Sequence, residues 1–428
     1  MSTLVQEIPG ALAPAKSIGL VDRIARRFVL DRLRGLRQGE LALIDNVEQS
    51  LFGQRDELRA ELVVHRPRLF RDAVLGGTLG VAESYIRGDW DSRDLTALFR
   101  IFLRNRSAKD SLDSRASYGA RIGRRIMHWL RDNTPAGSRR NIRAHYDLGN
   151  DFFSLWLDET LAYSSAVFTD PAQSLAAASM EKFDRVCRKL DLRPEDHLLE
   201  IGTGWGGFAL HAAQQYGCRV TTTTVSQRQF ETALQRFQAA RLDERITALQ
   251  QDYRDLQGQF DKLASIEMIE AVGYRHFDQY FESLGRLLRP DGSLVLQAIV
   301  MPERGYSSYL QSVDFIQRFI FPGGCLPSLS AMLESAGRAS DLRCVHVEDF
   351  APHYAETLRR WRRAFDEQRG EIRAMGYSDE FLRMWTYYLC YCEAAFEERS
   401  VGVVQIQFDK PGCRRDPAVL SRRAATTV

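Results

Sequence analysis

Residues 198–207 read Leu-Leu-Glu-Ile-Gly-Thr-Gly-Trp-Gly-Gly, and this stretch decides the predicted fold class. A short apolar segment runs into four glycines within six residues, and residues 208–216 then follow a helical pattern. Glycines let the backbone turn tightly and approach a ligand with no Cβ in the way. The first turn of the next helix also offers N–H groups without helical partners. The stretch is typical of the first strand–helix turn of a doubly wound sheet, where ligands bind at the carboxyl ends of the strands.

The spacing of the glycines indicates the kind of ligand. The pattern Glu-x-Gly-x-Gly-x-Gly differs from Gly-x-Gly-x-x-Gly, in which the loop cradles a pyrophosphate. It favours a nucleoside without phosphates, and we expect S-adenosylmethionine. The strand before the loop and the helix after it argue against the alternative, an ordinary glycine-rich loop. The loop residues expected to contact the ligand are Gly202, Thr203, Gly204 and Gly206.

The composition indicates a globular protein. Its 428 residues allow two domains or three, and 44% hydrophobic residues can form a sizeable core. The formal net charge of +2 implies no nucleic-acid partner. No apolar run of about 18 residues predicts a membrane span, and the N-terminus lacks the pattern of a secretory signal. Seven scattered cysteines show no zinc spacing and no disulfide framework, so we expect no metal site and a cytoplasmic location.

The N-terminal part is predicted to be a small α/β domain. Residues 20–36 keep a near-helical apolar spacing with arginines among them, which predicts a basic amphipathic helix. Such a helix either rests on an anionic lipid surface or packs on its own domain with its basic face in water, and the sequence leaves both open. Short strands are expected at 61–64 and 68–70. A second arginine-rich segment, residues 105–142, predicts a helix followed by an exposed linker.

From residue 141 onward, strand and helix patterns alternate, which predicts a mostly parallel sheet covered by helices. Between residues 300 and 390 we expect a long, aromatic-rich, mainly helical insertion. The fold class is therefore α/β, a doubly wound Rossmann-like domain with a smaller N-terminal α/β domain. The expected strands are 197–201, 218–225, 246–250, 261–267, 293–299 and 401–408.

Polar residues after the second and third strands are further candidates for nucleoside contacts. Many ribose-binding sites have an acid at the end of the second strand, whereas here Thr224 and Gln229 offer hydrogen bonds. The third strand leads into Asp252 and Tyr253, where adenine would lie: the tyrosine can stack on the purine, and the carboxylate can accept from its amino group. The alternative for Thr224 and Gln229 is a threonine-rich strand followed by a serine that caps the next helix. The alternative for Asp252 and Tyr253 is an exposed turn.

Two carboxylates follow the fourth strand, in the segment Glu267-Met-Ile-Glu-Ala-Val-Gly273. A carboxylate at the end of this strand faces the reacting methyl group, where it can orient a base or stabilise positive charge. Burial would raise its pKa. We expect Glu270 to take this role, with Glu267 as the competing candidate, and a purely structural role is the alternative for either.

Taken in order, these segments resemble the cyclopropane-fatty-acyl-phospholipid synthase family over nearly the whole chain. The resemblance implies an S-adenosylmethionine-dependent methyltransferase that adds a methylene group to the cis double bond of a phospholipid acyl chain. Further matching segments lie at 144–153, 161–165, 314–316, 320–324, 352–354 and 387–392. The implied ligands of S-adenosylmethionine are Tyr163, Ser164, Gly202, Gly204, Thr224, Gln229 and Tyr253.

The resemblance also implies an anion pocket beside the methyl group. In the family this pocket holds a bicarbonate ion that acts as the base, and the ligands carried over are Glu270, Tyr354 and the backbone at Ile299. Many members have a cysteine where this chain has Ser165 and a histidine where it has Gln297. Both residues keep hydrogen-bonding ability but supply no cationic imidazole, so binding of bicarbonate is left open.

The family's late cysteine falls on Cys392, for which catalysis and packing are both open, since a lone cysteine is most often a small buried hydrophobe. The resemblance further implies three parts: a lipid-interacting domain with its linker at 1–140, a methyltransferase domain with a helical acyl-binding insertion at 141–410, and a polar tail at 411–428. The expected partner is a bilayer with unsaturated acyl chains, met from the inner membrane face as a peripheral protein. A homodimer is left open.

Three alternatives remain for the function. The first is another C-methylation of the same acyl substrate, which would give a methyl-branched or furan-precursor lipid. The second is a small-molecule N-methyltransferase on the same fold. The third is a lipid-surface binding protein with a degenerate cofactor site.

Overall fold

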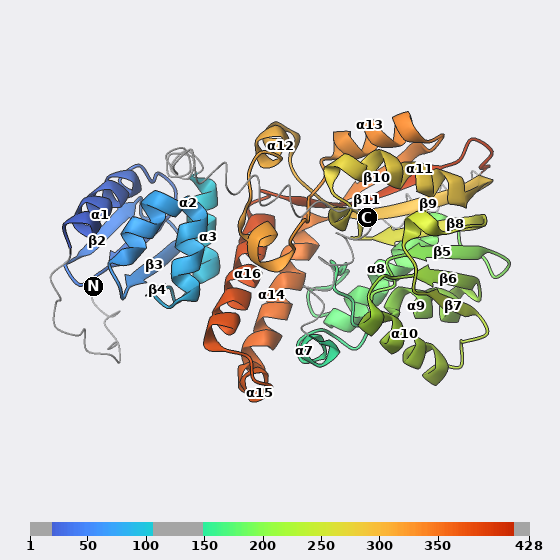
Figure 1. Cartoon of the computed structure of the whole chain (residues 1–428), viewed down its shortest axis with the longest axis horizontal. Helices are drawn as coiled ribbons and strands as arrows, with labels where there is room; N and C mark the ends of the chain where they lie inside the picture. The colour runs from blue at the N-terminus through green and yellow to red at the C-terminus, as the bar shows by residue number, and fades with distance from the viewer. Residues whose placement is uncertain (1–18, 106–148, 415–428) are drawn as a thin grey trace. The chain divides into compact units, whose positions relative to one another are not determined.

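The computed structural model describes residues 19–105 and 149–414. The segment predicted as a helix and linker at 105–142 lies almost wholly outside the described residues, as does the first half of the matching segment 144–153. The chain divides into two compact units (Figure 1). The described residues of the first fall within Met1–Gly123 and Tyr377–Ala394, and those of the second fall within Arg124–Gly376 and Ala395–Val428.

The first unit is a small α/β domain, as predicted. Its four-stranded sheet has the order β2-β1-β3-β4, in which only the β1–β3 pair is parallel. The amphipathic helix expected at 20–36 is α1. The elements are α1 (Leu20–Leu33), β1 (Glu40–Ile44), β2 (Gln49–Gly53), β3 (Arg59–Val64), α2 (Arg68–Ile86), β4 (Trp90–Asp91) and α3 (Leu95–Arg104).

Two features of this unit differ from the prediction. The strand expected at 68–70 is wrong, because α2 begins at Arg68 and buries Leu69 and Ala73 at helical spacing. Most of helix α16 (Asp379–Glu397) belongs to this unit, whereas the sequence placed it in the second domain. Arg383 explains the assignment, since its guanidinium donates to the backbone oxygens of Tyr85 and Trp90 at 2.6 and 2.7 Å.

The second unit is built on a seven-stranded sheet of order β10-β11-β9-β8-β5-β6-β7 (Figure 1). Strand β11 runs antiparallel to both of its neighbours, and the other paired strands are parallel. All six predicted strands are present, which confirms the doubly wound α/β class. The strands are β5 (His197–Ile201), β6 (Arg219–Thr223), β7 (Ile246–Leu249), β8 (Phe260–Ile266), β9 (Leu288–Val300), β10 (Arg343–Asp349) and β11 (Gly402–Asp409).

Strands buried on both faces explain why the pattern was readable. Leu198 packs on the face covered by α8, α9 and α10, and the next residue, Leu199, packs on the face covered by α11 and α13. Continuous apolar runs are the sequence signature of such strands. The helices are α7 (Asn150–Ser154), α8 (Leu175–Leu190), α9 (Gly207–Tyr216), α10 (Gln227–Ala239), α11 (Phe277–Leu287), α12 (Glu303–Tyr309), α13 (Leu329–Ala339), α14 (Ala351–Glu367) and α15 (Arg369–Ala374).

Among the described residues, no helix combines the length and apolar character needed to cross a membrane.

Candidate functional site

A pocket opens at the carboxyl ends of β5, β6 and β8, where the glycine loop was expected to place it. Gly202, Gly204 and Gly206 all have positive φ angles, of 97°, 52° and 85°, a region that favours glycine. A Cβ on Gly206 would come within 2.6 Å of the Phe237 ring, whereas one on Gly204 would meet no atom within 4 Å. Gly204 lines the pocket, so a side chain there would project into the space for a ligand.

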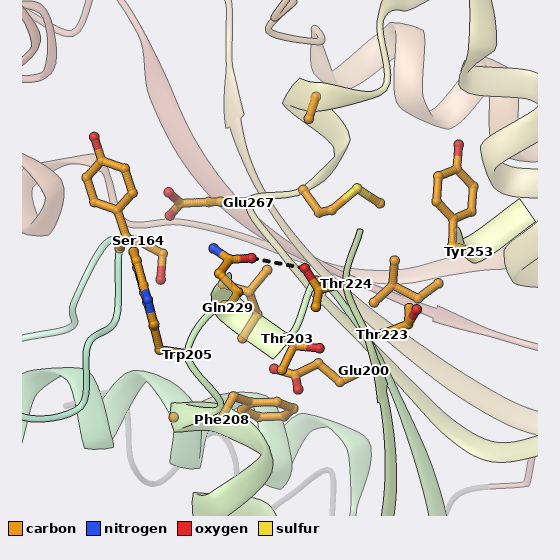
Figure 2. A pocket seen from close by; sticks show the side chains of 18 of the residues that line it. Ser164, Glu200, Thr203, Trp205, Phe208, Thr223, Thr224, Gln229, Tyr253 and Glu267 are labelled. Carbon is orange, nitrogen blue, oxygen red and sulfur yellow. Dashed lines mark hydrogen bonds between the residues drawn. The ribbon is translucent and has the colours of Figure 1, made fainter. Parts of the chain in front are cut away.

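The middle of the pocket carries the predicted hydroxyl and amide groups. The Thr224 hydroxyl donates to Gln229 Oε1 at 3.0 Å, which orients the amide toward the cavity (Figure 2). Ser226 caps helix α10 by accepting from the N–H of Gln229, so the loop after β6 is fixed from both sides. Both predicted nucleoside ligands of this strand therefore lie in one cavity.

Tyr253 and Asp252 form one end of the pocket, at the start of a short 3₁₀ turn. Figure 2 shows the Tyr253 ring on the opposite side from Ser164 and Glu267. The buried Asp252 carboxylate pairs with Arg254, accepting from its guanidinium at 2.7 and 2.8 Å. The aspartate is thus held in place by this arginine, and Tyr253 offers its aromatic ring to the ligand.

Two ionisable residues that line the pocket, Lys182 and Glu200, were not among the predicted site residues. Lys182 on α8 lines the pocket, is fully buried, and donates from Nζ to the Ser164 hydroxyl at 2.7 Å. Burial lowers the pKa of Lys182 to about 8, against the attraction of nearby carboxylates. Glu200 at the end of β5 is also buried and accepts from the Thr222 hydroxyl at 2.6 Å, and burial raises its pKa to about 8.

A sequence signal for Lys182 exists in retrospect. It lies four residues from both Ala178 and Val186, on the buried stripe of an amphipathic helix where an apolar residue is expected. A lysine in such a position is rarely buried without a partner. The residue therefore pointed to a polar site beneath α8.

Glu267 lines the pocket and is held by three donors. Its Oε1 accepts from the backbone N–H of Ser165 at 2.9 Å and from Gln297 Nε2 at 2.7 Å, and its Oε2 accepts from the Tyr354 hydroxyl at 2.7 Å. Burial raises the pKa of Glu267, while these hydrogen bonds and the charge of Lys182 oppose the rise. Among the described residues, the pocket wall includes Glu267 but none of its three donors.

Glu270 lies behind this wall. Its Oε1 accepts from the backbone N–H of Ile299 at 2.6 Å, and its buried Oε2 accepts no hydrogen bond from the described residues. Burial, together with repulsion from Glu267, raises the pKa of Glu270 to about 8. The structure thus brings all five predicted anion-pocket residues together, around a pair of carboxylates.

The donors of Glu267 are themselves fixed. Gln297 on β9 accepts from Gln405 Nε2 at 3.0 Å, and Gln405 in turn accepts from Lys189 at 2.5 Å. With its oxygen committed to Gln405, the amide of Gln297 presents its NH₂ group to Glu267. The Tyr354 ring stacks on Phe396 with centroids 4.3 Å apart.

The model of the family described as mycolic acid cyclopropane synthetase matches residues 134–406. The tuberculostearic acid methyltransferase UfaA1 of Mycobacterium tuberculosis is 37% identical over 420 residues, which cover 94% of this chain and 93% of that protein. The chain belongs to the mycolic acid cyclopropane synthetase family. As a member, it is an S-adenosylmethionine-dependent methyltransferase.

Two further members of this family are informative. The cyclopropane-fatty-acyl-phospholipid synthase of Escherichia coli is 36% identical over 358 residues, covering 82% of this chain and 88% of that protein. The mycolic acid cyclopropane synthase CmaA1, solved as a complex with SAH and CTAB, has 31% identity and a TM-score of 0.60. It covers 64% of this chain and 98% of its own.

The predicted cofactor residues gather in one cavity, and Cys392 is not among the described residues that line it. Cys392 lies on α16, in the part of that helix assigned to the first unit, and is partly exposed. Its catalytic role stays a prediction. The predicted cofactor residues that line the pocket are Tyr163, Ser164, Gly202, Thr203, Gly204, Thr224, Gln229, Asp252 and Tyr253; Gly206 supports the loop from behind.

Proposed function

We propose that the protein transfers a one-carbon unit from S-adenosylmethionine to the cis double bond of a phospholipid acyl chain and closes a cyclopropane ring. The observation that carries this proposal is the Glu267 carboxylate, held by three donors at the end of the pocket opposite Tyr253. When a methyl group is transferred to an amine, the proton released from the nitrogen can go to water. Ring closure removes a proton from carbon in a dry site, and therefore needs a positioned base.

The pocket residues suit S-adenosylmethionine, which as a substrate would supply an electrophilic methyl group on a sulfonium. The N–H groups after Gly202, the Gln229 amide and the Tyr253 ring would hold its adenosine part. Lys182 and the Ser164 hydroxyl, 2.7 Å apart, would then face its carboxylate at the opposite end. This orientation leaves the methyl group on the side of Glu267.

An aromatic cluster beside the pocket would serve the acyl chain. Attack by the double bond leaves positive charge on a carbon, and aromatic ring faces stabilise such charge. The ring of Tyr163, which lines the pocket, lies 5.3 Å from the rings of Phe153 and Trp361 and 5.7 Å from that of Trp156. These rings also exclude water, which would otherwise capture the cation.

Helix α1 supports a peripheral contact with a lipid surface. Leu20, Val21 and Ile24 are 70, 61 and 63% exposed, while Leu30 and Leu33 are buried in the domain. Exposed arginines lie among these apolar side chains, a composition that favours an anionic membrane surface. In our proposal the first unit brings the enzyme to the inner membrane face, where its acyl substrate lies.

Product analysis tests the proposal. The gene is expressed in a bacterial host whose own cyclopropane synthase gene has been deleted, and the fatty acid methyl esters are analysed by mass spectrometry before and after mild hydrogenation. We expect esters one CH₂ heavier than the monounsaturated parent that take up no hydrogen. An unchanged ester profile in the presence of soluble, folded protein would refute the proposal.

A second candidate is a methyl-branched acyl product. It is favoured by the 37% identity to the tuberculostearic acid methyltransferase, which extends over 94% of this chain. The first product would then be an open chain with a methylene branch, again one CH₂ heavier, and a saturated branch would need a separate hydride donor. Hydrogenation separates the two candidates, because the methylene takes up hydrogen under conditions that leave the ring intact.

A further inference from the structure

The groups that the family resemblance assigns to bicarbonate already have an occupant in this chain. Ser165, Gln297 and Tyr354 donate to the carboxylate of Glu267 at 2.9, 2.7 and 2.7 Å. A carboxylate and a bicarbonate ion present the same pair of anionic oxygens on a planar centre. The side chain of Glu267 therefore satisfies the donors that an added anion would need.

The position of Glu267 in the backbone is also unusual. Its φ of 50° lies in the left-handed region, where glycine is the residue without strain. Its N–H is fixed on the backbone oxygen of Gln297 at 2.8 Å, so the conformation follows from the end of β8 and the neighbouring β9. A non-glycine residue held in this region is a recognised mark of functional sites.

Electrostatics argue against a second anion at this place. Bicarbonate bound there would meet the charge of Glu267 and the carboxyl group of Glu270, whose buried Oε2 accepts no hydrogen bond from the described residues. Lys182 is the cation whose charge acts on Glu267 among the described residues, and its hydrogen bond goes to Ser164. The residues present thus do not fit bicarbonate.

We propose that the Glu267 carboxylate is itself the base of the ring-closing step, so that turnover needs no bicarbonate. This inference rests on the proposed function. The alkene π pair forms a bond to the methyl carbon as the S–C bond breaks, and that bond's electron pair stays on sulfur. A C–H bond of the transferred methyl group then breaks: its proton goes to a Glu267 oxygen, and its electron pair forms the second ring bond to the cationic carbon. The proton afterwards leaves Glu267 through the pocket to solvent.

The test compares turnover with and without bicarbonate. Assays use full-length protein, liposomes with unsaturated chains and S-adenosylmethionine, in buffer freed of carbon dioxide and then supplemented with bicarbonate. Wild-type turnover is expected to be equal in both. Glu267→Gln is expected to lower kcat by about 10²- to 10⁴-fold, the usual contribution of a general base, without recovery on adding bicarbonate.

Glu267→Gly provides the complementary variant, because glycine suits the positive φ and vacates the space of the carboxylate. Its turnover is expected to be low and to rise with added bicarbonate, and ¹³C NMR should detect bicarbonate bound to this variant and not to the wild type. Glu195→Gln, an exposed carboxylate before β5, is the matched control and should behave as wild type. Calorimetry with S-adenosylmethionine shows that each variant retains a folded pocket.

Two results would overturn the inference: wild-type turnover that falls when bicarbonate is removed, or a folded Glu267→Gln variant that turns over at the wild-type rate. Both presuppose that the wild type modifies the lipid. If it forms no lipid product at any bicarbonate concentration, the proposed function fails instead, so the two failures are distinguishable.

Discussion

Replacement of Lys182 by methionine should weaken cofactor binding without destabilising the fold. Burial lowers the Lys182 pKa from 10.5 to about 8 even against the attraction of nearby carboxylates, so its surroundings disfavour the charged form by a net of about 3 kcal/mol, at about 1.36 kcal/mol for each pH unit. Methionine has a similar shape and carries no charge, so this penalty disappears. The cost is the hydrogen bond to Ser164 and, in our account, the attraction for the carboxylate of S-adenosylmethionine.

A hydrogen bond to a charged group contributes about 1.5–3 kcal/mol, which corresponds to about a 10- to 150-fold rise in Kd. Isothermal calorimetry with S-adenosylmethionine measures this Kd, and thermal unfolding followed by circular dichroism measures stability. We expect weaker binding together with an equal or higher Tm. Lys262→Met, on β8 and outside the pocket, should leave the Kd unchanged. Unchanged affinity in Lys182→Met, together with a lower Tm, would show that the lysine is structural and refute the reasoning.

Three further predictions concern the loop, the buried acid and the first helix. Gly204→Val should raise the Kd for S-adenosylmethionine by at least about tenfold, because its side chain would enter the pocket at a φ of 52°; Gly337→Ala on α13 is the control, and equal affinity in both variants contradicts the loop assignment. Glu270 has a pKa of about 8 in the folded protein against 4.5 in the unfolded chain, so it stabilises the fold at low pH and this contribution is lost as pH rises toward 8. Glu270→Gln should therefore raise Tm more at pH 8 than at pH 5. An increase in Tm that is the same at both pH values would contradict the raised pKa of Glu270. The double substitution Leu20→Ser and Ile24→Ser should reduce binding to anionic liposomes, and added salt should weaken the binding that remains. Binding that is neither reduced by the substitutions nor weakened by salt would show that α1 does not contact the lipid surface.

Strands β5, β9 and β11 were predictable because consecutive residues in them are buried on both faces and show as largely apolar runs. β10 was missed for the opposite reason: nearly all its residues are exposed, so no apolar pattern marks it. The assignment of α16 to the first unit also has no local signal, since it depends on Arg383 reaching backbone oxygens about 300 positions earlier in the chain.

The sequence predicted most residues of the candidate site, but it did not predict the hydrogen bonds between them. The glycine loop and the residues after each strand follow from spacing, because the carboxyl ends of parallel strands meet at one edge of the sheet. The family resemblance grouped Ser165, Gln297 and Tyr354 around an anion, but their hydrogen bonds to Glu267 and the bond from Lys182 to Ser164 are seen only in the folded chain. The sequence favoured Glu270 over Glu267 for the role beside the methyl group, and this choice stays a prediction; among the described residues, Glu267 lines the pocket and Glu270 does not.

The central claim is that the enzyme adds a one-carbon unit to an acyl double bond and closes a ring. The most direct measurement is mass spectrometry of the phospholipid acyl chains from a synthase-deficient host expressing the wild-type chain, with a parallel culture expressing the Gly204→Val variant, in which we expect cofactor binding to be weakened. The account predicts chains heavier by one CH₂ that resist mild hydrogenation, found with the wild type alone. Acyl chains that remain unmodified, or labelled methyl groups recovered in a water-soluble amine, would contradict it.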